Sequence, residues 1–99
     1  MADKKIVWSE FAKLELAATL EFYLLQNGNP DYSLKLLNDI EDLLTTLSKS
    51  EFIGRLTSNK TTRIISMKIY SIFYEINNDQ IEIVSFWDDR QNPNNRKVK

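Results

Sequence analysis

Apolar residues in the first half of the chain recur every three or four positions, which is the spacing of one helix face. Residues 10–26 predict a helix, because Ser9 suits a helix start and Gly28 suits a helix end. A second helix is predicted for residues 31–47, restarting at Asn29-Pro30-Asp31. The expected core stripe of the first helix is Phe11, Leu14, Leu16, Ala18, Leu20, Tyr23 and Leu25, and that of the second is Leu36, Leu37, Ile40, Leu43, Leu44 and Leu47. The short turn between them predicts an antiparallel helical hairpin.

After the hairpin the spacing changes to every second position, which is typical of strands. Three strands are predicted, at residues 62–67, 70–77 and 80–87, and a short first strand is predicted at residues 4–8. The order β-α-α-β-β-β predicts an α+β fold, in which the antiparallel helical hairpin packs on a small, twisted, mainly antiparallel sheet.

Two further details of the fold are expected. In the last strand Ile81, Ile83 and Ser85 alternate with Glu82, Val84 and Phe86, so the side that carries Glu82 is expected to meet solvent. Residues 48–61 form a polar connection, and its apolar side chains are expected to anchor it to the core. These anchors are Phe52, Ile53 and Leu56.

Composition excludes several kinds of chemistry. The 99 residues suffice for one domain, residues 1–99, with a basic tail from about residue 90. The absence of Cys and His excludes disulfides, thiolate nucleophiles, imidazole metal ligands and Ser-His pairs. Asp88-Asp89 is expected to be a solvated turn, and no phosphate-binding or dinucleotide motif is present, so no metal and no cofactor is predicted.

No segment has the length of apolar residues that a signal peptide or a membrane span requires. We therefore expect a soluble, cytoplasmic protein with no membrane partner.

The net charge of −1 conceals a division along the chain. Residues 1–50 hold five Lys and eight acidic residues, whereas residues 51–99 hold eight Lys or Arg and six acidic residues. The basic residues expected to bind an anionic target are Arg55, Lys60, Arg63, Lys68, Arg90, Arg96 and Lys97. The alternative interpretation is that they are solvated loop and tail residues.

Tyr70 and Tyr74 lie among these basic residues in the sequence. Arg offers a planar fork to phosphate, and Tyr stacks on bases, so a sheet with both suits RNA. Residues four apart on a strand share one face, however, so the two tyrosines equally fit a core position beside Ile72 and Ile76. Periodicity alone leaves both interpretations open.

The chain from about Lys4 to Pro93 also resembles a known family. The resemblance is carried by the element order, the turn Phe52-Ile53-Gly54-Arg55, Arg63 ahead of Tyr70-Ser-Ile-Phe-Tyr74, and an ending that contains Arg90-Gln-Asn-Pro93. In these features it resembles the RelE/ParE superfamily of toxins from bacterial type II toxin–antitoxin modules.

The resemblance implies a growth inhibitor that is neutralised by a cognate antitoxin, with which it forms a hetero-oligomer. RelE-like members cut messenger RNA on the ribosome, whereas ParE-like members inhibit DNA gyrase. Ser71 occupies the position where RelE-like enzymes place a key Arg, and no His lies near the C-terminus. The resemblance therefore favours the ParE-like branch, with gyrase as the target.

Two other functions stay open at this point. One is a RelE-like, ribosome-dependent endoribonuclease that needs no metal, in which Arg63, Tyr70, Tyr74 and Arg90 would be catalytic through positioning and electrostatic stabilisation of the phosphate. The other is a toxin-fold protein that has lost its activity and binds only the antitoxin, so that its overexpression would be harmless.

Overall fold

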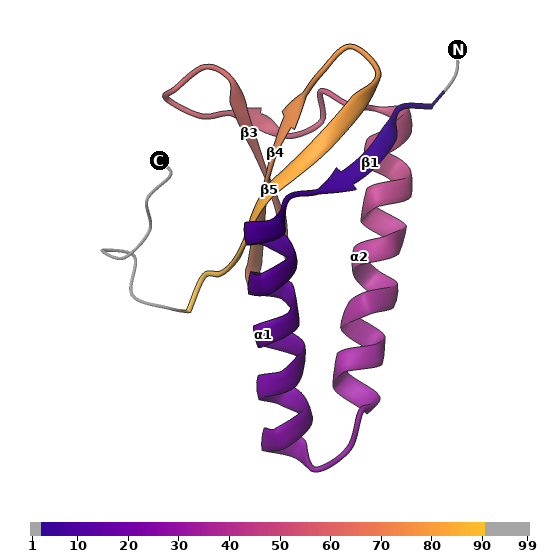
Figure 1. Cartoon of the computed structure of the whole chain (residues 1–99), viewed down its shortest axis with the longest axis vertical. Coiled ribbons are helices and arrows are strands. Elements are labelled where there is room, and N and C mark those ends of the chain that lie inside the picture. Colours follow the sequence, from indigo (N-terminus) through magenta and orange to yellow (C-terminus); the bar gives the residue numbers. More distant parts are fainter. Residues whose placement is uncertain (1–2, 91–99) are drawn as a thin grey trace.

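The fold is described from a computed structural model, for residues 3–90. The elements are β1 (Lys5–Trp8), α1 (Glu10–Asn27), α2 (Asp31–Lys49), β2 (Arg55–Leu56), β3 (Thr62–Met67), β4 (Tyr70–Ile76) and β5 (Gln80–Asp88). The helices form a hairpin that packs against the sheet, and the end of the hairpin with the turn extends beyond the sheet (Figure 1). The predicted α+β order is confirmed, with one addition: the two-residue strand β2.

The sheet has five strands in the order β1-β5-β4-β3-β2. Strand β1 pairs with β5 in parallel, and the other three pairs are antiparallel, so the prediction of a mainly antiparallel sheet is confirmed. The chain begins at one edge of the sheet with β1 and continues into the helical hairpin of α1 and α2. It then builds the sheet from the far edge, β2, back towards β1.

The two predicted boundaries of α1 are both confirmed by their capping contacts. The Ser9 side chain accepts a hydrogen bond from the Ala12 N–H at 3.0 Å. Gly28 ends the helix in the left-handed region, at φ 73°, and its N–H donates to the Leu24 carbonyl.

The core lies between the hairpin and β4 and β5. Its fully buried members come from α1 only at Ala12, and from the other elements at Leu36, Ile40, Leu47, Tyr70, Ile72, Tyr74, Ile81, Ile83 and Phe86. Leu16 and Leu20 pack against it from α1 while keeping part of their surface exposed. The small side chain at Ala12 lets α1 lie close to β5.

The predicted core face of α1 is wrong in part. Phe11, Leu14, Ala18 and Leu25 are exposed. Apolar residues occur around most of the circumference of this helix, so periodicity could not select the buried side. The core takes the side that carries Ala12 instead.

A β-bulge in β5 overturns part of the predicted alternation. Phe73 pairs with Ser85 and Tyr74 pairs with Ile83, which leaves Val84 without an opposite residue. Ile81 and Ile83 face the core as predicted, but beyond the bulge it is Phe86, not Ser85, that joins the core.

The predicted anchoring of residues 48–61 is also wrong. Phe52, Ile53 and Leu56 are exposed, whereas Gly54 and Thr57 are buried. Polar contacts, described below, hold this connection in place of apolar ones.

Candidate functional site

Tyr70 lies on the core face of β4 and has no exposed surface. Its ring stacks on Phe86, with 5.1 Å between the ring centroids. Its hydroxyl lies 2.9 Å from the hydroxyl of Tyr32 on α2. Burial, together with this contact, raises the pKa of Tyr70 well above its usual range. The phenol is therefore protonated at neutral pH.

Tyr74 is buried on the same face of β4, and its hydroxyl is also fully used. It accepts a hydrogen bond from the Gly54 N–H at 2.9 Å and donates one to the Glu51 carbonyl at 2.8 Å. Burial raises the pKa of Tyr74. A Cβ added at Gly54 would lie 2.6 Å from this hydroxyl and 2.9 Å from the Ile64 carbonyl oxygen, so only glycine fits here. Both tyrosines therefore occupy core positions and do not present their rings on an exposed face of the sheet.

Arg63 is directed towards the protein itself. Its Nη1 donates to the Gly54 carbonyl at 2.7 Å, and its guanidinium lies over the Phe52 ring, 5.0 Å from the centroid. Arg63 therefore helps to fix the connection between α2 and β3.

Arg90 is similarly engaged, at the other end of β4. Its guanidinium binds both carboxylate oxygens of Asp88, at 3.1 and 2.8 Å, and lies over the Tyr23 ring of α1. In the strand register Tyr74 is opposite Arg63, whereas Tyr70 is opposite Asp88. The four-residue step between the tyrosines is about 13 Å of extended strand, so the two arginines lie at opposite ends of β4.

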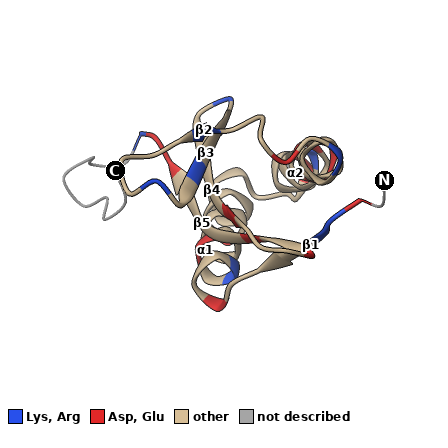
Figure 2. Ribbon diagram, turned by 90° about the horizontal axis from the view of Figure 1, so that it is seen from above, with Lys and Arg blue, Asp and Glu red and all other residues tan. Residues whose placement is uncertain are grey.

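The other predicted basic residues divide in the same way. Arg55 on β2 and Lys60 in the turn before β3 are exposed near the Arg63 end. Lys68, at the Tyr70 end, is paired with Asp39 of α2 at 2.8 Å, and this hydrogen bond raises the pKa of Lys68 and lowers that of Asp39. Figure 2 shows basic residues at several separate places. The last two predicted residues, Arg96 and Lys97, lie outside the described residues.

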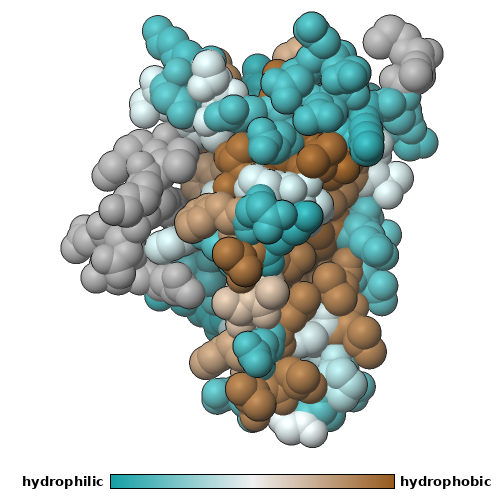
Figure 3. All heavy atoms as spheres, in the orientation of Figure 1, coloured by the Kyte–Doolittle hydropathy of each residue, from teal (hydrophilic) through white to brown (hydrophobic). Residues whose placement is uncertain are grey.

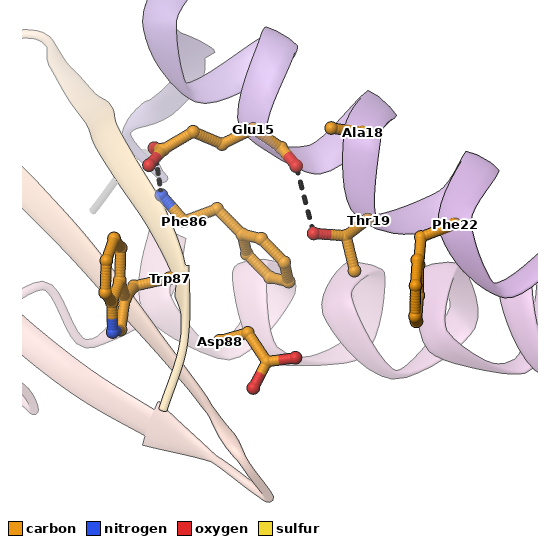
Figure 4. A pocket seen from close by; sticks show the side chains of 7 residues that line it. All are labelled: Glu15, Ala18, Thr19, Phe22, Phe86, Trp87 and Asp88. Atoms are coloured by element: carbon orange, nitrogen blue, oxygen red, sulfur yellow. Dashed lines mark hydrogen bonds between the residues drawn. The ribbon is translucent and has the colours of Figure 1, made fainter. Parts of the chain in front are cut away.

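Glu15 of α1 is a polar contact that the sequence pattern did not predict. Strand β1 pairs with β5 only as far as Ile83, so within residues 3–90 the edge of β5 beyond that point has no strand partner. A carboxylate oxygen of Glu15 accepts a hydrogen bond from the Phe86 N–H at 2.8 Å (Figure 4). The same oxygen accepts a hydrogen bond from the Ser85 hydroxyl, also at 2.8 Å. Burial raises the pKa of Glu15.

The outer side of α1 carries an exposed apolar stripe. We call it the α1 stripe, and it consists of Phe11, Leu14, Ala18, Phe22 and Leu25. The positions fall at steps of three and four residues, so they follow one line along the helix. Figure 3 shows hydrophobic residues gathered over the part of the molecule that the helices form.

Two hollows lie beside the α1 stripe. The first, of about 340 Å³, is lined by α1 and the end of β5 and includes Ala18, Phe22 and Glu15 (Figure 4). The second, of about 390 Å³, shares Phe22 and extends to Arg90. The stripe and hollows form one exposed, partly apolar surface, which is the kind of surface that binds a protein partner.

This arrangement defines a class: a small α+β protein whose exposed apolar helix suits protein binding, and whose candidate catalytic residues within residues 3–90 are not assembled. Comparison with known proteins identifies the family. Residues 6–93 match the family described as the ParE toxin of the type II toxin-antitoxin system, parDE. The chain belongs to this family and is a ParE-like toxin.

A solved structure supports the fold independently. The chain is similar to a protein from the chromosomal ParDE toxin–antitoxin system of P. aeruginosa, with a TM-score of 0.71 and 21% sequence identity. The match covers 84% of this chain and 92% of that chain. No curated protein matches the chain. No helix within the described residues is long and apolar enough to cross a membrane.

The Glu15 contact predicts a specific dependence of stability on pH. Because the folded protein raises the pKa of this carboxyl above 4.5, its contribution to the free energy of unfolding is greatest below pH 4.5. That contribution is lost as the pH rises through the folded pKa. A Glu15→Gln variant keeps a hydrogen-bond acceptor without the charge. As the pH rises above 4.5, its melting temperature should therefore increase relative to that of the wild type.

Glu15→Ala is the matched control, because it leaves the Phe86 N–H without this acceptor. We expect it to lower the free energy of unfolding by about 1–3 kcal/mol, measured by urea denaturation at pH 7. Equal stability of all three proteins between pH 4 and pH 8 would contradict this account of Glu15.

Proposed function

We propose that this ParE-like toxin arrests growth by binding DNA gyrase, without cleaving RNA, and that a cognate antitoxin neutralises it by covering the α1 stripe. Toxin and antitoxin would form a hetero-oligomer. Both would act in the cytoplasm, where gyrase works.

We choose gyrase over RNA as the target because of how the four candidate catalytic residues are arranged. These residues are Arg63, Tyr70, Tyr74 and Arg90. A ribonuclease needs groups within hydrogen-bond reach of one phosphate and its attacking hydroxyl. Here Tyr70 and Tyr74 have no exposed surface and both hydroxyls are engaged. Arg63 and Arg90 lie at opposite ends of β4 and are each held by other contacts. This supports inhibition by binding over catalysis by these groups.

The α1 stripe supports the antitoxin surface. Leu14 and Leu25 keep 67% and 76% of their surface exposed, which is unfavourable for a protein that has no partner there. A continuous apolar line along a helix, with hollows beside it, suits an amphipathic helix whose apolar residues follow the same three- and four-residue steps. We expect the antitoxin to supply that helix.

The target is tested with purified proteins. We expect the chain to inhibit DNA supercoiling by gyrase, and we expect addition of the cognate antitoxin to restore it. The same preparation should leave messenger RNA uncut in a translating ribosome extract. RNA cleavage with normal supercoiling would instead identify a ribosome-dependent endoribonuclease. An effect on neither reaction, together with intact antitoxin binding, would identify an inactive toxin fold.

The antitoxin surface is tested by Leu14→Glu. Burying a charge where a leucine side chain is expected to pack should weaken antitoxin binding at least about tenfold, measured by calorimetry. The melting temperature should stay close to that of the wild type, because Leu14 is exposed.

Leu24→Glu is the matched control, because Leu24 lies on another side of the same helix and is 43% exposed. It should bind the antitoxin as the wild type does. If Leu14→Glu binds as tightly as Leu24→Glu, the α1 stripe is not the antitoxin surface.

A further inference from the structure

A second exposed apolar surface lies on the connection between α2 and β3. It consists of Phe52, Ile53 and Leu56, which are 66%, 46% and 45% exposed, and we call it the loop patch. Strand β2 is the edge of the sheet farthest from β1, whereas α1 packs against β5, with β4 and β3 between. Figure 2 shows β2 and α1 on opposite sides of the molecule. The loop patch is therefore separate from the α1 stripe.

The loop patch is held in one conformation by polar contacts that leave its apolar side chains exposed. The Tyr74 hydroxyl binds the backbone at Glu51 and Gly54, and Arg63 binds the Gly54 carbonyl. Leu56 belongs to the ladder between β2 and β3. Because this segment is already ordered, a partner that binds it causes little further loss of conformational entropy.

The surroundings of the loop patch are basic. Between residues 49 and 63 the chain holds Lys49, Arg55, Lys60 and Arg63. The one acidic residue in this range, Glu51, lies 3.6 Å from the Lys4 ammonium group, which balances its charge.

The turn that carries Lys60 is also fixed. Lys60 adopts the left-handed region at φ 65°. The Asn59 side chain supports this turn, because its oxygen accepts hydrogen bonds from the Thr57 hydroxyl and from the N–H groups of Thr61 and Thr62. Glu75 of β4 binds the Thr62 hydroxyl on the face of the sheet that also carries Arg55. Leu56 and Arg63 share the opposite face, so Glu75 does not neutralise the side on which they lie.

An apolar centre inside a charged rim is the pattern of a protein–protein interface, with the aromatic residue as its anchor. A nucleic acid would offer phosphates to the rim, but it would have no apolar pocket for Ile53 and Leu56. Arg63 already covers one side of the Phe52 ring, which leaves less of it for stacking on a base. The chemistry therefore favours a protein partner.

We infer that the loop patch is the surface through which the toxin engages its target, and that the partner presents an apolar pocket surrounded by acidic side chains. This inference rests on the proposed function in so far as the target is a protein. It assigns the two apolar surfaces to different partners: the α1 stripe to the antitoxin, and the loop patch to the target.

The test compares two exposed phenylalanines, one from each surface. Phe52→Ala should raise the toxin concentration that half-inhibits supercoiling at least about tenfold and should abolish growth arrest, while leaving antitoxin affinity unchanged. Phe22→Ala should do the opposite, weakening antitoxin binding while it keeps the inhibition. Inhibition by the wild type should also weaken as the salt concentration rises, because of the basic rim.

Melting temperatures of the variants separate binding from folding. Because Phe52 contacts Arg63, Ile53→Ser provides a second variant of the loop patch, and it should also lose inhibition. The inference is overturned if Phe52→Ala and Ile53→Ser inhibit as strongly as the wild type, whatever the target. It is also overturned if their defect is lost binding to RNA.

The two proposals fail in distinguishable ways. If the wild type leaves gyrase active but both variants lose growth arrest with a normal melting temperature and normal binding of RNA, gyrase is the wrong target and the loop patch stands. If the wild type inhibits gyrase and the variants do so equally, gyrase is the target but the loop patch is not the surface that binds it. A wild-type chain that arrests neither growth nor gyrase overturns both.

Discussion

Two tyrosine rings lie in the core of this protein, and their hydroxyls must find hydrogen-bond partners there. A buried hydroxyl without a partner destabilises the folded state, so the segments around Tyr70 and Tyr74 are arranged to satisfy them. Tyr70 meets Tyr32 and so links the sheet to α2, while Tyr74 binds the backbone at Glu51 and Gly54. The helical hairpin and the connection after it are thus both fastened to β4 by phenol groups that have no contact with solvent.

This constraint also shapes the surface. Because Tyr74 and Arg63 hold the connection through polar contacts, Phe52 and its apolar neighbours remain exposed. On the other side of the molecule, the Glu15 carboxylate accepts a hydrogen bond from the Phe86 N–H at the edge of β5. The small side chain of Ala12 lets α1 lie close to the sheet. Several larger apolar residues of α1 are consequently left on its outer side, namely Phe11, Leu14, Phe22 and Leu25. A small toxin thereby gains two apolar surfaces without enlarging its core.

The order of elements could be predicted from sequence because it depends on local signals: helical and strand periodicity, the cap at Ser9 and the end at Gly28. The details that failed depend on tertiary contacts. Periodicity could not orient α1, whose apolar residues surround it. The bulge at Val84 reverses the alternation of β5 without a sequence signal, and a two-residue strand such as β2 is too short to show any period. At the site, residue types were visible in the sequence. Whether Tyr70 faced solvent or the core depended on which side of the sheet the hairpin covered.

The central claim is that this toxin acts by binding a target of DNA metabolism, with its tyrosines serving the fold. The most direct test is to pulse-label new DNA and new protein in bacteria within minutes of inducing the chain without its antitoxin. The account predicts that DNA synthesis falls first while translation continues. An early fall in protein synthesis, with DNA synthesis unaffected, would contradict it.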